Sequence, residues 1–266
     1  MLTQRWDGGS LARRPDELIV EEPLEVHLDG HLVGTTMRTP GHDFELAVGL
    51  CHGDGLLGGA TVRSCRYCAT GSAVDTDFNV VSVDTGGQAP RPTPRVAAST
   101  SACGMCGSIA LDELRDRIAP MPVGEAWPVE LLAGMPAVVR PEQDLFEMTG
   151  AVHAAAAFDR SGRVGLVRED IGRHNAVDKV IGRLLLDGAL PATDLGLYIS
   201  GRAGFEIVQK AWAAGCSAVV AVSAPSALAV DAARQAGITL AGFVRAERTK
   251  SSGDRVTCNI YSPEQG

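Results

Sequence analysis

The chain has 266 residues, of which 45% are hydrophobic and 21% are charged, and its formal net charge is −8. These proportions are those of a soluble globular protein with one large or two modest cores. The negative charge disfavours general nucleic-acid binding, which needs Lys and Arg side chains against the phosphates. The sequence has no run of about 18 apolar residues that would span a membrane and no apolar signal peptide, so we expect a cytoplasmic protein without a membrane partner.

The first sixty residues predict a β-hairpin followed by a helix. Apolar and polar residues alternate over residues 17–40, around the turn-forming pair Asp29 and Gly30, which is typical of two antiparallel strands. The stretch "HDFELAVGLCHG" then has apolar residues at helical spacing, with Asp43 placed to cap the first turn.

Two short strands and a linker are expected next. The strands lie around residues 61–67 and 77–84, and "DTGGQAPRPTPR", residues 84–95, is too rich in Gly and Pro for regular structure. Beyond this linker, "GSIALDELRDRIAP" places its apolar residues on one face of a helix that ends before Pro120.

From about residue 145 to the end, helices and strands alternate, which is typical of an α/β layer domain. We interpret "MTGAVHAAAAF" as a small-residue helix or turn, and predict strands in "RVGLVRE", "LGLYIS", "SAVVAVS", "ITLAGFVR" and "VTCNIYS". Helices are predicted in "HNAVDKVIGRLLLDG", "AGFEIVQKAWAAG" and "PSALAVDAARQAG", the last with Pro225 in its first turn and Gly237 at its end. The sheet is expected to be partly parallel, with ligands at the loops that follow its strands.

These patterns divide the chain into three expected parts. Residues 1–95 form an N-terminal β-rich region, residues 96–122 hold a cysteine pair and the helix after it, and residues 123–266 form the α/β domain that would bind a cofactor. Four loops of that domain, "DIGRHN", "GRAGF", "APSAL" and "VRAER", present Gly, Ser, Arg, His and Asn, and three of them precede helices. Such groups suit a phosphate or a polar heterocycle.

Seven cysteines without a signal peptide argue against a disulfide framework. Cys51, Cys216 and Cys258 lie in apolar segments and are interpreted as small buried hydrophobic residues. The other four form two C-x-x-C pairs, Cys65 with Cys68 and Cys103 with Cys106.

Three roles are open for the pair Cys103 and Cys106. The four paired thiols could hold a structural zinc ion, although the pairs stand further apart than in ordinary zinc sites. A C-x-x-C at a helix start could also cycle as a redox dithiol. The small neighbours in "TSACGMCGS" would equally give the access that a persulfide carrier needs. The residues alone do not choose among these roles.

Six motifs, in order between about residues 100 and 260, indicate a family resemblance that composition does not reveal. They are "SACGMCG", "TGAVHAAAAFD", "EDIGRHNAVDK", "SGRAGFEIVQKA", "APSALAV" and "GITLAGFVR", and together they closely resemble the FdhD/NarQ family of sulfur carrier proteins required for formate dehydrogenase activity.

The resemblance implies a sulfurtransferase that takes persulfide sulfur from a cysteine desulfurase. It would pass this sulfur to the molybdenum cofactor, as bis(molybdopterin guanine dinucleotide), before the cofactor enters formate dehydrogenase. The family's active cysteine maps to Cys103, Cys106 would assist transfer or resolve the persulfide, and the family suggests a homodimer. A rival hypothesis is a molybdenum-cofactor chaperone whose C-x-x-C pairs serve a structural zinc. Under the leading hypothesis we expect no permanent metal.

The resemblance also implies where the cofactor binds. The segment after the "GITLAGF" strand maps to Phe243, Val244, Arg245, Ala246, Glu247 and Arg248. The strand-end loops add Arg173 and Arg202 for phosphates, His174, Asn175 and Ser226 for the base or ribose, and the neighbouring Ser200 and Gly201. Each has a simpler alternative: such an arginine is as often a solvated charge, and Asn175 would also cap a helix over residues 176–186.

In fold, the family is similar to the zinc-dependent cytidine deaminases, which implies a three-layer α/β domain. Those enzymes place a glutamate two residues after a zinc-binding histidine. Here Ala155 stands two residues after His153, so we predict no deaminase chemistry and interpret His153 as a hydrogen-bonded packing residue.

Overall fold

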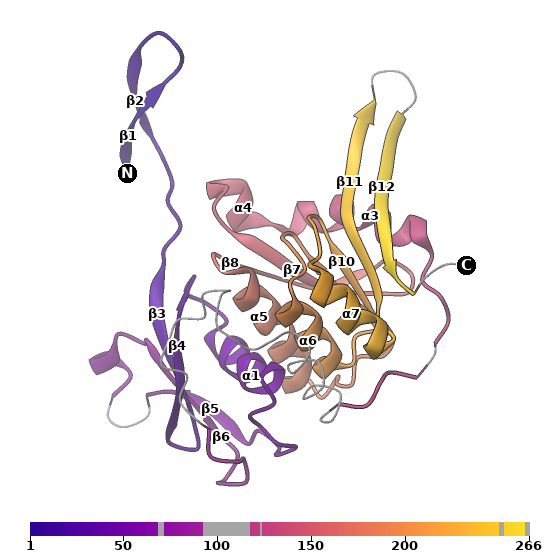
Figure 1. The fold of residues 1–266 in the computed structure, drawn as a ribbon. Coiled ribbons are helices and arrows are strands. Elements are labelled where there is room, and N and C mark those ends of the chain that lie inside the picture. The colour runs from indigo at the N-terminus through magenta and orange to yellow at the C-terminus, as the bar shows by residue number, and fades with distance from the viewer. Residues whose placement is uncertain (69–71, 93–117, 123, 250–252, 264–266) are drawn as a thin grey trace.

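The computed structural model describes residues 1–68, 72–92, 118–122, 124–249 and 253–263 (Figure 1). Cys103, Cys106 and the helix predicted before Pro120 lie outside the described residues. No helix within the described ranges is long and apolar enough to cross a membrane.

The N-terminal region holds two sheets. An antiparallel pair, β1 and β2, stands away from the body of the molecule in Figure 1 and was not predicted. The second sheet has the order β4-β3-β6-β5, and β3 and β4 form the predicted hairpin, with Asp29 and Gly30 at positive φ in its turn. The strand bounds are β1 Leu2–Trp6, β2 Leu11–Pro15, β3 Glu22–Leu28, β4 His31–Arg38, β5 Ser64–Tyr67 and β6 Val80–Asp84.

Helix α1 (Asp43–Gly53) confirms the predicted helix but corrects its cap. The N-cap is His42, at φ 58°, and Asp43 is the first helical residue. The Asp43 carboxylate accepts hydrogen bonds from Nε and Nη2 of Arg38, both at 3.1 Å, and so joins the helix to the end of β4. The side chain therefore serves a buried ion pair instead of the helix terminus. A short 3-10 turn, η1 (Val74–Thr76), lies between β5 and β6.

The second half of the chain forms a six-stranded sheet of order β12-β11-β10-β9-β7-β8. Strands β9, β10 and β11 are parallel, whereas β7 runs antiparallel to both of its neighbours and β12 antiparallel to β11, so the sheet is partly parallel as predicted. The bounds are β7 His153–Asp159, β8 Val164–Asp170, β9 Leu195–Ile199, β10 Ala218–Ala221, β11 Thr239–Thr249 and β12 Gly253–Ser262.

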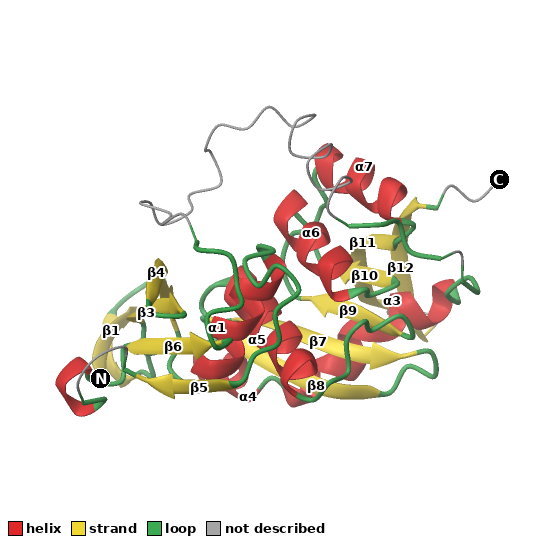
Figure 2. Cartoon of the chain, turned by 90° about the horizontal axis from the view of Figure 1, so that it is seen from below, coloured by secondary structure: helices red, strands yellow, loops and turns green. Residues whose placement is uncertain are grey.

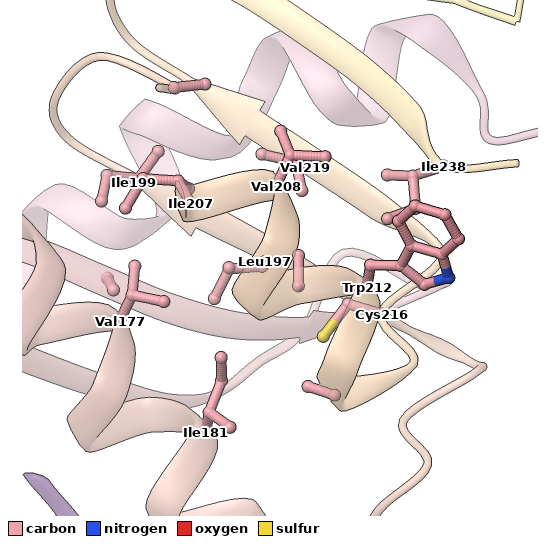
Figure 3. Close-up of a cluster of buried hydrophobic side chains, with 14 of the residues drawn as sticks. Val177, Ile181, Leu197, Ile199, Ile207, Val208, Trp212, Cys216, Val219 and Ile238 are labelled. Carbon is pink, nitrogen blue, oxygen red and sulfur yellow. The ribbon is translucent and has the colours of Figure 1, made fainter. Parts of the chain in front are cut away.

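Helices cover both faces of this sheet, which confirms the three-layer α/β architecture (Figures 1 and 2). One face packs against α5, α6 and α7 through residues such as Ile199, Val208 and Trp212, drawn in Figure 3. The other face packs against α3, where Trp127, Leu132 and Phe158 are buried. The helix bounds are α3 Val129–Val139, α4 Asp144–Thr149, α5 Arg173–Leu186, α6 Phe205–Ala214 and α7 Ala227–Ala236, with the 3-10 turn η2 at Arg140–Glu142. The more specific likeness to cytidine deaminases and the three domain boundaries stay predictions.

Two local predictions in this half are wrong, and one helix was not predicted. "HAAAAFD" is the interior strand β7, next to the edge strand β8, and not a helix or turn, because Ala155 and Ala156 face opposite cores and their small side chains let helices lie close on both sides. Helix α3 was missed, since Pro136 inside it is a helix breaker by propensity. Pro225 precedes the N-cap Ser226 and so lies outside α7, although Gly237 ends that helix as predicted.

The N-terminal region and the α/β domain meet at a close crossing of α1 and α5. A Cβ atom built on Gly49 would lie 1.9 Å from the Asp178 carbonyl oxygen, and one on Gly182 would lie 1.8 Å from that of Glu45. Only glycine allows the two backbones to approach this closely.

Buried charges surround this crossing. Lys210 Nζ lies 2.7 Å from Asp178 Oδ1 and 3.6 Å from Asp54 Oδ1, and Lys179 Nζ lies 2.7 Å from Asp170 Oδ2. Burial raises the pKa of Asp178 to about 6, even though Lys210 attracts its charged form.

Replacing Lys210 with methionine is therefore expected to destabilise the protein in a pH-dependent way. Without the ammonium group the pKa of Asp178 rises further above its unfolded value of 3.8, so the native state binds more protons than the unfolded state between these values. Stability then falls as pH rises, by about 3–5 kcal/mol relative to wild type near pH 8 and by less near pH 5. Urea denaturation at both pH values measures this, and an equal loss at both would contradict the charge argument.

Candidate functional site

The loops singled out from the sequence meet at one edge of the six-stranded sheet. Strands β8, β9, β10 and β11 point the same way, so their carboxyl ends share this edge with the start of β7. Helices α5, α6 and α7 begin directly after three of them. Backbone hydrogen bonds join the loops: Ser223 N donates to Gly201 O, Ser226 N to Ala203 O, and Phe243 N to Ser223 O.

A cavity of about 820 Å³ opens at this edge. Tyr198 and Ser200 contribute to it from the end of β9, and Val244 and Arg245 from β11. His153 lines it at the start of β7. Ile171 and Val222 line it directly after β8 and β10, and the remaining wall comes from the stretch that runs from α3 to the loop before β7.

His153 is held at the edge of this cavity as a neutral side chain. Its Nδ1 lies 3.3 Å from the Ser200 hydroxyl, which also accepts a hydrogen bond from Ala154 N at 2.9 Å. Burial, followed by the charges of Arg173 and His174, lowers the pKa of His153. A neutral imidazole both donates and accepts hydrogen bonds, so His153 can contact a polar ligand without adding charge.

A β-bulge turns β11 towards the cavity. The pairing with β12 shifts between Gly242 and Arg245, and Phe243 adopts a left-handed φ of 53°. Within this bulge Val244 is buried against the α3 core, while the Arg245 guanidinium stands 5.9 Å from the centre of the Phe243 ring. Bulges commonly re-aim side chains near functional sites, and here the bulge brings Val244 and Arg245 to the cavity wall.

Several predicted cofactor residues have partners inside the protein. Asn175 lies in the first turn of α5, whose N-cap is Gly172, and its amide donates to Met37 O and Asp170 Oδ1 and accepts from Thr36. It thus joins β4 to α5 and does not cap the helix. His174 Nε2 lies 3.0 Å from the Glu206 carboxylate, and the Ser226 hydroxyl caps α7 by accepting from Ala229 N.

Of the predicted residues, Ser200, Val244 and Arg245 line the cavity. Arg173 and Gly201 lie next to it: a Cβ on Gly201 would be 3.3 Å from His153 and 3.4 Å from Arg173, so this glycine leaves room for both side chains. Arg202 is exposed. Ala246, Glu247 and Arg248 lie further along β11, and the structure does not describe their side chains.

One wall of the cavity was missed by sequence reasoning. It consists of Arg140, Gln143 and Phe146, from η2 and α4, together with Tyr198. The Arg140 guanidinium lies 4.3 Å from the Phe146 ring centre, and burial raises the pKa of Tyr198 to about 12. The segment "RPEQDLFEM" places a charge, an amide and an aromatic ring before β7, which is the signal that could have drawn attention to it.

None of the described cysteines lines this cavity. Cys51 and Cys216 are buried as predicted, and Cys258 is partly buried against the α3 core. Burial raises the pKa of Cys65 to about 11. Within the described ranges, no three metal-binding side chains come together.

Comparisons with known proteins bear on this arrangement. The model of the FdhD/NarQ family matches residues 19–265. The chain is 46% identical to a protein of Streptomyces avermitilis named sulfur carrier protein FdhD, over 98% of this chain and 92% of that one. It is 47% identical to a protein of the same name from Nocardia farcinica, over 94% and 88% of the two chains. A crystal structure of a putative formate dehydrogenase accessory protein from Desulfotalea psychrophila has a similar fold, with a TM-score of 0.76, 23% identity, and coverage of 99% and 96%.

Proposed function

Because this chain belongs to the FdhD/NarQ family, we propose that it is a cytoplasmic sulfurtransferase that activates formate dehydrogenase. It takes sulfur from a cysteine desulfurase as a persulfide on Cys103 and supplies it to bis(molybdopterin guanine dinucleotide). The names of its relatives support sulfur carriage, and the likeness to the accessory protein from Desulfotalea psychrophila supports a role towards formate dehydrogenase. A homodimer belongs to the same proposal.

The observation that carries the cofactor part is the cavity at the strand ends. Its volume of about 820 Å³ lies within the range of small-molecule sites. The guanidinium group of Arg245 is suited to a phosphate, and the aromatic ring of Phe146 to a planar heterocycle. One nucleotide end of the cofactor carries both kinds of group, so the residues present fit it as a bound substrate.

The proposed chemistry uses two thiol exchanges. The Cys103 thiolate attacks the terminal sulfur of the desulfurase persulfide, so that Cys103 gains the sulfur and the desulfurase leaves as a thiolate. Once the cofactor is bound, the Cys106 thiolate attacks Sγ of Cys103, which forms a Cys103–Cys106 disulfide and releases hydrosulfide with the bonding electron pair to the cofactor; without the cofactor the persulfide stays on Cys103. A cellular dithiol reductant must reduce the disulfide before the next cycle.

Intact-protein mass spectrometry tests this function. We expect the wild-type protein, after incubation with a cysteine desulfurase and cysteine, to gain the mass of one sulfur atom that a reducing agent removes. The Cys103→Ala variant should gain none, because the accepting thiolate is gone.

The matched control is Cys216→Ala, which removes a thiol that burial keeps protonated. This variant should gain sulfur like the wild type. If neither the wild type nor the control gains sulfur and native spectra show bound zinc instead, sulfur carriage is wrong and the zinc-bearing chaperone takes its place.

A further inference from the structure

Gln143 presents a buried carboxamide that has no partner inside the described protein. The residue is 5% exposed, and it lines the cavity at the strand ends. Its backbone is fully used, since its N–H donates to Arg140 O and its carbonyl accepts from Glu147 N. No described residue makes a hydrogen bond to its side chain.

Gln143 stands where its side chain could cap helix α4, but another residue caps that helix. Gln143 is the N-cap of α4, where a side-chain oxygen ordinarily accepts from the first free N–H groups of the helix. Here the Glu169 carboxylate accepts from Leu145 N and Phe146 N, both at 2.8 Å. The carboxamide of Gln143 is therefore left without a role in the fold.

The unpaired amide faces the cavity. The polar side-chain atoms that are fully enclosed without a partner, among the described residues, are His27 Nδ1 and Arg173 Nε. The amide atoms of Gln143 thus keep contact with open space, and the space that this residue lines is the cavity. Because the described part of the fold leaves both amide atoms unpaired at the cavity, they are placed to pair with a bound ligand.

We propose that Gln143 recognises the heterocyclic ring of the bound ligand through a lactam edge. Its Oε1 accepts from a ring N–H and its Nε2 donates to the adjacent ring carbonyl, the two complementary hydrogen bonds that a carboxamide offers. Phe146, with Arg140 stacked 4.3 Å from its centre, supplies an aromatic surface on the same wall. This inference rests on the proposed function, whose cofactor carries the lactam edge in both its guanine and its pterin rings.

Calorimetric binding tests the inference on the full-length protein. The probes are guanosine diphosphate and neopterin, which have the lactam edge, and adenosine diphosphate, which has an amino group in place of the carbonyl. We expect Gln143→Met, of similar size and without polar atoms, to weaken binding of a lactam probe about tenfold or more. Binding of adenosine diphosphate should change little, so the preference between the two nucleotides should collapse. The probe that loses affinity identifies the ring as guanine or pterin.

The control is Gln209→Met, which makes the same substitution at the cavity lined by His52 and Leu186, by the C-terminal end of α5, and removes the hydrogen bond from Gln209 to Gly53 O. It should leave all three affinities unchanged, and thermal melting of both variants shows whether they fold. The inference is overturned if the wild type binds neither lactam probe, if folded Gln143→Met binds both as the wild type does, or if adenosine diphosphate loses as much affinity as guanosine diphosphate. Persulfide formation on Cys103 in Gln143→Met is measured in parallel: its presence upholds the proposed function when the ring assignment fails, and its absence in the wild type refutes that function separately.

Discussion

A Cys103→Ala variant is expected to leave formate dehydrogenase inactive in a strain that lacks the wild-type protein. If Cys103 holds the persulfide, no other step can replace it, and activity should fall to the level of the strain without the protein. The chemical reason is that sulfur transfer requires an accessible thiolate as nucleophile. Formate oxidation in extracts, with the variant's abundance checked by immunoblot, measures the effect.

The other cysteines provide the control for this result. Burial raises the pKa of Cys65 to about 11 and that of Cys216 to about 12, so these thiols stay protonated near neutral pH. Single replacement of either by alanine should preserve activation. Activation retained in Cys103→Ala, or lost in Cys216→Ala with normal protein abundance, would assign the sulfur to a different residue.

Much of the fold could be predicted because its signals are local. The hairpin around Asp29 and Gly30 and the helix that ends at Gly237 depend on turn and cap chemistry within a few residues. The strand β7 was missed because its alanines favour a helix by propensity, whereas its conformation is set by helices packed on both faces of the sheet. Helix α3 was missed because Pro136 disfavours a helix by propensity, whereas the packing of α3 against the sheet tolerates this proline.

The site was predictable in its position and less so in its lining. The motif order placed the loops after the strands, and the sheet brings those loops to one edge. The sequence does not show that the Asn175 amide donates hydrogen bonds to Met37 O and Asp170, because its contacts with β4 join segments about 140 residues apart. Nor does the sequence show that the Glu169 carboxylate caps α4 while the Gln143 side chain lines the cavity. The cap by Glu169 depends on β8 lying beside α4 in the folded chain.

Replacing Gly182 with alanine is expected to lower the free energy of unfolding by about 3 kcal/mol or more, at the upper end of overpacking effects. The added methyl group would lie 1.8 Å from the Glu45 carbonyl oxygen and 2.8 Å from Gly49 N. Both are backbone atoms, so no side-chain rotation relieves the clash, and α1 must move away from α5. Because α5 begins beside the cavity, the variant should also bind cofactor fragments less tightly.

Gly134→Ala is the matched control, because it makes the same change inside α3, where nothing lies within 4 Å of the added Cβ. There the methyl group should stabilise the protein by up to about 1 kcal/mol through helix propensity. Urea denaturation of both variants compares the two effects. A Gly182→Ala protein as stable as the wild type would mean that α1 and α5 are free to separate, and that the close glycine crossing does not hold the N-terminal region against the α/β domain.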